Sequence, residues 1–179
     1  MRILGLGTGR CGTASLARLL AQQGLDCVHE REPTLSWENE PDASRHISQP
    51  GSCDVALQYL PHVECLMGQF DDLRCVCLKR DREKTIASFA RIRPLCSHWF
   101  STKPDQTNVN DRSFPKYDLP FEESVGRYWD DYYAKAESLE CERFRVYPTE
   151  TLNDPSGVRE LLTFLGIPEP VVVVGIHIN

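Results

Sequence analysis

The sequence predicts a single α/β domain in which a mainly parallel sheet lies between two layers of helices. Short apolar runs typical of buried strands alternate with segments of helical period, and mostly short links join them. A chain of 179 residues is long enough for one compact domain and too short for two ordinary ones. We therefore expect one three-layer α/β/α domain over residues 1–179.

The first half of the chain supplies three of the predicted strands. A short apolar run over residues 2–7 ends in a glycine-rich turn, and such a run is typical of a buried strand. Leucines at helical spacing follow, and Gly24 is a natural stop for that helix. Polar residues 31–53 predict a loop with one short helix, and Pro61 suits the first turn of another helix. The predicted elements are strands over residues 2–7, 26–29 and 54–60, with helices over residues 13–23 and 61–70.

The second half contains a near-continuous apolar run, Arg74–Leu78, which predicts a central strand buried on both faces. Asp81 can cap the helix that follows this strand. Residues 94–120 are polar and without period, and a loop that long inside a compact domain predicts a lid or binding loop. The remaining predicted elements are helices over residues 82–91, 121–139 and 155–165 and a strand over residues 144–147.

The composition is that of a soluble globular protein, with 41% hydrophobic and 26% charged residues. No apolar run approaches the roughly 20 residues of a membrane span, and no signal peptide is evident, so we expect a cytoplasmic protein. The eight cysteines are then expected to be reduced thiols. A net charge of −6 argues against a nucleic-acid partner, whereas the basic segment Lys79–Arg93 would suit a small polyanion.

The turn Gly7–Gly12, GTGRCG, predicts an anion site at the start of the first helix, where backbone N–H groups and the helix dipole favour negative charge. The glycines match the dinucleotide pattern G-x-G-x-x-G, and Glu30 or Glu32 follows at the spacing expected of a ribose-binding acid. Against a dinucleotide, Arg10 would crowd a closely apposed pyrophosphate. The ATP pattern G-x-x-x-x-G-K-[ST] has no match.

Residues Gly7–Leu16, GTGRCGTASL, resemble the 5′-phosphosulfate loop of sulfotransferases, the enzymes that use 3′-phosphoadenosine 5′-phosphosulfate. That loop carries Lys or Arg, a small residue, Gly-Thr, and then Thr or Ser. Here Ala14 replaces the second hydroxyl residue, so Ser15 is the substitute. The resemblance implies that the donor is bound by Arg10, Cys11, Gly12, Thr13, Ala14 and Ser15.

Residues Cys77–Arg91, CLKRDREKTIASFAR, resemble the 3′-phosphate site of the same family, in which a strand-ending arginine precedes a helical serine by eight residues. Those residues are Arg80 and Ser88, a guanidinium and a hydroxyl suited to grip a phosphate. Residues Val146–Pro170 resemble the strand, turn and helix that close many sulfotransferases. The three segments, in this order, imply the P-loop NTPase-like topology of that family.

The resemblance also has departures. Cytosolic sulfotransferases end in an arginine-rich segment that holds the 3′-phosphate, and this sequence has no such segment. Their adenine-stacking tryptophan could correspond to Trp37, Trp99 or Trp129.

The resemblance implies in-line transfer of a sulfuryl group to an acceptor hydroxyl, a reaction that needs no metal. Arg10 would stabilise charge on the bridging oxygen, and a base would take the proton of the acceptor. Glu30, at the end of the second strand and beside the first, is the expected base. The alternatives are His29, which strand alternation would turn to the other face, Glu32 and Tyr59.

Two other functions fit parts of the sequence: a Rossmann-type NAD(P)-dependent oxidoreductase, and a non-catalytic nucleotide-binding module. For a sulfotransferase, residues 31–53 and 94–120 are expected to shape the acceptor pocket. Their mixed polarity leaves a sugar, a phenol, a lipid headgroup and a peptide tyrosine as acceptors. The expected partner is thus a small-molecule or carbohydrate acceptor, and the sequence sets no oligomeric state.

Overall fold

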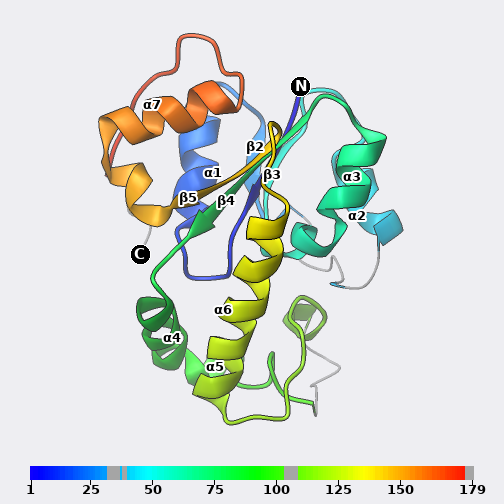
Figure 1. Cartoon of the computed structure of the whole chain (residues 1–179), viewed down its shortest axis with the longest axis vertical. Helices are drawn as coiled ribbons and strands as arrows, with labels where there is room; N and C mark the ends of the chain where they lie inside the picture. The colour runs from blue at the N-terminus through cyan, green and yellow to red at the C-terminus, as the bar shows by residue number, and fades with distance from the viewer. Residues whose placement is uncertain (32–36, 38–39, 103–108, 176–179) are drawn as a thin grey trace.

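The protein is described by a computed structural model that covers residues 1–31, 37, 40–102 and 109–175. Five strands form one sheet in the order β2-β3-β1-β4-β5, and every neighbouring pair is parallel (Figure 1). All carboxyl ends of the strands therefore meet at one edge, which confirms the predicted α/β class. The strands are β1 (Arg2–Leu6), β2 (Cys27–His29), β3 (Cys53–Val55), β4 (Leu73–Lys79) and β5 (Phe144–Pro148).

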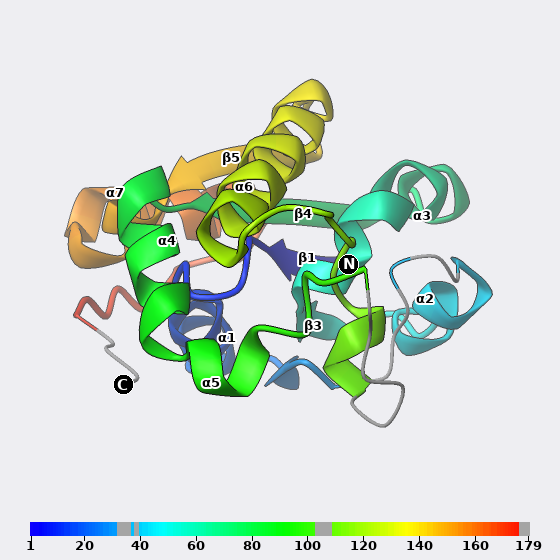
Figure 2. The same ribbon diagram turned by 90° about the horizontal axis from the view of Figure 1, so that it is seen from below.

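Helices connect the strands and cover both faces of the sheet (Figures 1 and 2). The α-helices are α1 (Thr13–Ala21), α2 (Glu40–His46), α3 (Val63–Gln69), α4 (Arg82–Arg91), α5 (Arg93–Cys96), α6 (Phe121–Ser138) and α7 (Pro155–Phe164). Three 3-10 helices are η1 (Leu57–His62), η2 (Val109–Arg112) and η3 (Thr149–Asn153). The Asp81 side chain accepts a hydrogen bond from the Lys84 N–H, so the predicted cap of α4 is confirmed.

The alternation of side chains along β4 divides the core between the two faces. Cys75 and Cys77 pack with the residues of α3 and α6, whereas Val76 and Leu78 pack with those of α1 and α7. All four are fully buried, as expected for a strand covered on both sides. This division confirms the predicted three-layer arrangement.

Two expectations about the first half of the chain were wrong. The second strand does not lie beside the first, because β3 pairs with β2 on one side and with β1 on the other. The predicted strand over residues 54–60 ends at Val55, and 3-10 helix η1 follows it. Pro61, which was predicted to begin a helix, lies inside η1, and α3 begins at Val63.

The segment predicted as a long loop is partly ordered by aromatic packing. Within its described residues, α5 begins it and η2 lies in its second half. Phe100 and Phe114 are buried and pack edge to face at 4.9 Å between ring centroids. Phe100 also contacts Tyr128 of α6, at 5.3 Å. This packing fixes the segment beside the carboxyl ends of the strands.

Candidate active site

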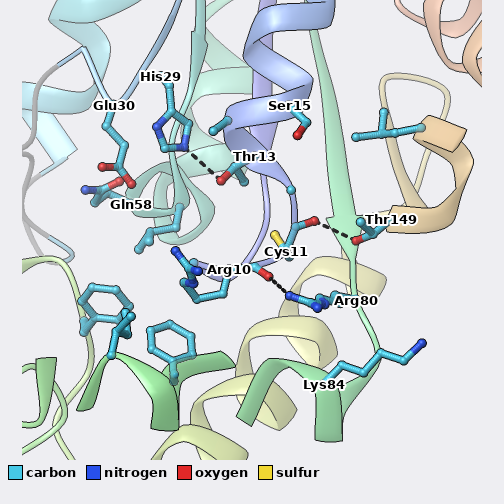
Figure 3. A pocket seen from close by; sticks show the side chains of 18 of the residues that line it. Arg10, Cys11, Thr13, Ser15, His29, Glu30, Gln58, Arg80, Lys84 and Thr149 are labelled. Atoms are coloured by element: carbon cyan, nitrogen blue, oxygen red, sulfur yellow. Dashed lines mark hydrogen bonds between the residues drawn. The ribbon is translucent and has the colours of Figure 1, made fainter. Parts of the chain in front are cut away.

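A pocket of about 630 Å³ opens at the edge of the sheet where the strands end (Figure 3). This is the edge at which parallel α/β sheets generally bind ligands, and the volume suits a nucleotide-sized molecule. The pocket is lined by eight of the residues predicted for donor binding and catalysis: Arg10, Cys11, Gly12, Thr13, Ala14, Ser15, Glu30 and Arg80. Two segments some seventy residues apart in the sequence therefore meet at one site.

The β1–α1 turn adopts a conformation that depends on its glycines. Gly7 and Gly12 have φ values of 148° and 96°, which L side chains rarely adopt. A Cβ atom at Gly7 would also lie 2.4 Å from the Cys11 Sγ. Arg10 has a φ of 69°, and such a value in a non-glycine residue is strained and is often found at functional sites.

Side chains from other elements hold this turn in place. The Gly7 N–H donates to the Tyr132 hydroxyl at 3.0 Å. Thr8 and Tyr133 share a hydrogen bond of 3.1 Å, and the Tyr133 hydroxyl donates to the Leu78 carbonyl at 2.7 Å. The turn is thus anchored on α6 and on β4.

The first turn of α1 presents backbone donors to the pocket. The N–H groups of Thr13, Ala14 and Ser15 lie in this turn, where no intrahelical acceptor is available. The Thr149 hydroxyl, at the end of β5, donates to the Cys11 carbonyl at 2.7 Å and holds the loop from the opposite side. Backbone donors of a first helical turn and the positive end of the helix dipole together suit a phosphate or phosphosulfate group.

Arg10 connects the two predicted motifs. Its Nε donates to the Ser88 Oγ at 3.1 Å, and the Arg80 guanidinium donates to the Arg10 carbonyl at 2.7 Å. Ser88 is only 1% exposed and does not line the pocket, unlike the other predicted donor-binding residues. The structure therefore brings Ser88 to Arg10, while its role toward a phosphate stays a prediction.

The basic segment of residues 79–93 divides into cations inside and outside the pocket. Arg80 and Lys84 line the pocket on the side of β5. Arg82 forms two hydrogen bonds with the Asp130 carboxylate, at 2.9 and 3.0 Å, and Lys79 pairs with Glu137. Two of the six cations in this segment thus line the pocket.

Two of the four candidate bases lie in the pocket. Glu30 has a φ of 54°, which is unusual for a non-glycine residue, and its N–H donates to the Val55 carbonyl at 3.0 Å. His29 shares a 2.9 Å hydrogen bond between its Nε2 and the Thr13 Oγ1 (Figure 3). The expectation that His29 turns away from Glu30 was wrong. Strand β2 ends at His29, and the left-handed backbone of Glu30 interrupts the alternation of side chains.

Of the other two candidate bases, the structure describes only Tyr59, which is not part of this arrangement. Tyr59 is fully buried in η1, where its hydroxyl donates to the Asp54 Oδ2 at 2.8 Å, and it does not line the pocket. Glu32 lies outside the described residues. Among the described candidates, Glu30 and His29 are therefore the two whose position suits a base.

Cys11 is chemically inert in this environment. Its side chain is fully buried, and burial raises the pKa of its thiol to about 12. The thiol is therefore neutral at physiological pH, and the loop contributes its backbone rather than a thiolate.

The three tryptophans differ in their relation to the site. Trp99 lines the pocket and stacks on Phe114, with ring centroids 5.0 Å apart and an interplanar angle of 15°. Trp129 donates its Nε1–H to the Arg80 carbonyl at 2.9 Å, and Trp37 packs against Tyr128. Of the three candidates for stacking on adenine, only Trp99 lines the pocket; the assignment stays open.

Several pocket residues escaped sequence analysis. Thr149 and Glu150 directly follow β5, and Gln58 lies just after β3. Their position after strands that end at the pocket is a signal that could have identified them. Phe114 comes from the segment predicted to shape a pocket, although no motif marked it individually, whereas Trp99 of the same segment was one of the three tryptophans considered for adenine stacking.

Two solved structures have a similar fold. A sulfotransferase from Alicyclobacillus acidocaldarius aligns with a TM-score of 0.57 and 14% identity, over 99% of this chain and 85% of its own. The sulfotransferase domain from the curacin biosynthetic pathway aligns with a TM-score of 0.58 and 15% identity, over 93% of this chain and 74% of its own. No protein-family model and no curated protein sequence matches the chain. The chain thus has a sulfotransferase-like fold, as its motifs implied.

Two features are absent from the described residues. None of the helices there has the length and apolar character needed to cross a membrane. No three His, Cys, Asp or Glu side chains in this part of the chain gather as metal ligands would. The expectation that the reaction needs no metal stays a prediction.

Proposed function

We propose that this chain is a sulfotransferase that transfers a sulfuryl group from 3′-phosphoadenosine 5′-phosphosulfate to an acceptor hydroxyl. The observation that carries this proposal is the meeting of the Arg10 loop with Arg80 in one pocket of a sulfotransferase-like fold. A loop for one phosphate and a separate arginine for another suit a donor that carries phosphates at two positions.

The donor would be held by backbone and side-chain donors from two sides of the pocket. The N–H groups of Thr13, Ala14 and Ser15 would bind the 5′-phosphosulfate, because they lie in the first turn of α1, at the positive end of the helix dipole. Arg80, with Lys84 nearby, would bind the 3′-phosphate.

Catalysis would require charge stabilisation and removal of one proton. Arg10 would stabilise the negative charge that develops on the bridging oxygen, an effect that can contribute about 3–4 kcal/mol. Its backbone carbonyl and its Nε are both hydrogen-bonded, so the guanidinium is oriented before the donor binds. Glu30 would take the acceptor proton, typically worth about 10²–10⁴-fold in rate.

The strand order argues against the dinucleotide-dependent oxidoreductase. In the Rossmann fold the second strand lies beside the first, and an acidic residue at its end reaches the ribose. Here β3 separates β2 from β1, so Glu30 is not placed as that acidic residue would be. The non-catalytic nucleotide-binding module differs from the proposed enzyme only in turnover, which a transfer assay decides.

Calorimetry with four nucleotides tests the donor. Adenosine 3′,5′-bisphosphate should bind more tightly than adenosine 5′-phosphate, ATP or NADH. Arg80→Ala should weaken the bisphosphate about 10- to 100-fold while changing adenosine 5′-phosphate little, because a charge-assisted contact to one phosphate is lost. Arg91→Ala is the matched control, since Arg91 is an exposed cation of the same segment outside the pocket. Tight NADH binding without bisphosphate binding would reject the proposal.

A further inference from the structure

The Glu30 side of the pocket contains a buried amide with one unused hydrogen-bonding atom. Gln58 is 2% exposed, and its Nε2 donates to the Ser113 Oγ at 3.2 Å. Its Oε1 accepts no hydrogen bond from the residues that the structure describes, although Gln58 lines the pocket. Because buried carbonyl oxygens are nearly always paired, this atom indicates a ligand that donates a hydrogen bond here.

The wall around Gln58 is aromatic and aliphatic. Trp99 and Phe114 stack almost parallel, and Phe89 meets Phe114 edge to face at 6.3 Å. Leu57 and Ile92 complete this wall. A flat apolar body fits such a surface, because it buries area without leaving polar groups unpaired.

This wall is distinct from the part of the pocket assigned to the donor. Figure 3 shows Glu30 and Gln58 on one side of Arg10, and Arg80, Lys84 and Thr149 on the other. The acceptor oxygen must approach the sulfur from the side opposite to the leaving phosphate, because the displacement is in line. The aromatic wall therefore borders the space that the acceptor would occupy.

We propose that the acceptor is a phenol that carries a second hydrogen-bond donor, which binds the Gln58 Oε1 while the ring packs against Trp99 and Phe114. This proposal rests on the proposed sulfuryl transfer. The phenol oxygen forms the new S–O bond, and the bond from sulfur to the bridging phosphate oxygen breaks. The electron pair of the broken bond stays on the bisphosphate, and the phenolic proton goes to Glu30. A sugar fits less well, because its several hydroxyls would face an apolar wall.

The test compares acceptors that differ by one hydroxyl. Catechol, resorcinol and hydroquinone are assayed against phenol, their monomethyl ethers and methyl glucoside. For at least one diol, kcat/KM should be about tenfold higher than for phenol and than for the monomethyl ether of the same diol. The ether keeps the hydroxyl that accepts the sulfuryl group but has no second hydroxyl to donate to Gln58. In Gln58→Met, which keeps length and volume, the ratio of diol to phenol should fall to about one. The proposal would be overturned if the ratio of diol to phenol in kcat/KM stayed the same in Gln58→Met. It would also be overturned if no diol were preferred over phenol, or if methyl glucoside were the preferred acceptor.

A second variant keeps the proposal testable if Gln58→Met does not fold. Trp99→Leu should raise the KM of the preferred diol about tenfold and leave the affinity for adenosine 3′,5′-bisphosphate within about twofold, because Trp99 is assigned to the acceptor. Loss of bisphosphate affinity would instead mean that Trp99 stacks on adenine, and the acceptor assignment would fail.

The two proposals can fail separately. If the bisphosphate binds and sulfuryl transfer occurs, but only to sugars, the enzyme assignment stands and the phenol assignment is wrong. If the bisphosphate does not bind, the enzyme assignment fails, and direct binding of the same phenols is then measured by nuclear magnetic resonance. A diol preference that depends on Gln58 would still support the aryl site, and its absence would reject it.

Discussion

The Nε of Arg10 donates a hydrogen bond to the Oγ of Ser88 at 3.1 Å, although 78 residues separate the two in the sequence. Ser88 is 1% exposed, and this contact joins the β1–α1 turn to helix α4. The hydroxyl therefore orients the one arginine that is proposed to stabilise charge during transfer. A residue that acts in this way affects the rate through the position of Arg10 rather than by touching the donor.

The first prediction concerns Ser88→Ala. Removing the hydroxyl frees the Arg10 side chain, so kcat should fall about tenfold, as expected for the loss of one hydrogen bond to a charged group. The affinities for adenosine 3′,5′-bisphosphate and for adenosine 5′-phosphate should change by the same factor. Calorimetry with both nucleotides provides an internal control. A selective loss for the bisphosphate would show that Ser88 binds the 3′-phosphate directly.

The second prediction concerns the base. Glu30→Gln should lower kcat about 10²–10⁴-fold and leave the affinity for the bisphosphate nearly unchanged, because the amide cannot take a proton. Glu150→Gln removes the same charge from the same pocket and should lower kcat less than tenfold. Steady-state transfer with both variants separates proton removal from a general effect of charge. An active Glu30→Gln enzyme together with an inactive His29→Gln enzyme would assign the base to His29.

The fold class and the glycine-dependent β1–α1 turn could be predicted because both depend on local sequence. The alternation of apolar runs with helical periods predicts a parallel sheet wherever it occurs. The glycines of the turn are required by its backbone, since Gly7 and Gly12 adopt φ values that other residues rarely adopt. Arg10 and Arg80 were identified from the resemblance of their segments to sulfotransferase motifs, and the structure brings them together.

The strand order and the aromatic wall could not be predicted in the same way. The sequence does not specify whether β2 pairs with β1 or with β3, because three-residue strands carry little pairing information. Gln58 belongs to a 3-10 helix that follows a strand ending earlier than predicted. Trp99 and Phe114 are 15 residues apart and stack only through tertiary packing. These features depend on contacts between distant residues, for which one sequence gives no signal.

The third prediction concerns the buried carboxyl group of Asp54. The Asp54 Oδ1 accepts the backbone N–H groups of Val55, at 2.8 Å, and Arg31, at 3.3 Å, and its Oδ2 accepts the Tyr59 hydroxyl. Burial raises the pKa of Asp54 above its ordinary range, and these hydrogen bonds oppose the rise. The folded protein therefore binds the proton of Asp54 more tightly than the unfolded chain does.

Linkage then fixes the direction of the pH effect. The stability contributed by protonated Asp54 is fully present below the ordinary Asp pKa and is lost as the pH rises through the raised pKa. Asp54→Asn keeps the Oδ1 acceptor and cannot ionise. Between the ordinary Asp pKa and the raised pKa, the free energy of unfolding of the wild type should therefore fall with rising pH, relative to that of Asp54→Asn. Urea titrations at several pH values measure the difference, and parallel curves would contradict the prediction.

The fourth prediction concerns Cys11, the cysteine inside the β1–α1 turn. Cys11 lies next to a cation, Arg10, in a loop at a helix N-terminus, and such a setting can lower a thiol pKa. Burial has the larger effect here and raises the pKa of Cys11 to about 12, so the thiolate is scarce at pH 8. Iodoacetamide should therefore modify the exposed Cys141 of the native protein and spare Cys11.

Mass spectrometry of the alkylated peptides checks this expectation, and the unfolded protein serves as the control in which both cysteines react. Bound adenosine 3′,5′-bisphosphate should leave the native pattern unchanged, because Cys11 is already covered by Gly7 and Tyr133 in the free protein. Modification of Cys11 at the rate of Cys141 would mean that the turn opens and exposes the thiol. The turn would then be a mobile segment that the donor must order, and its affinity for phosphate would carry that entropic cost.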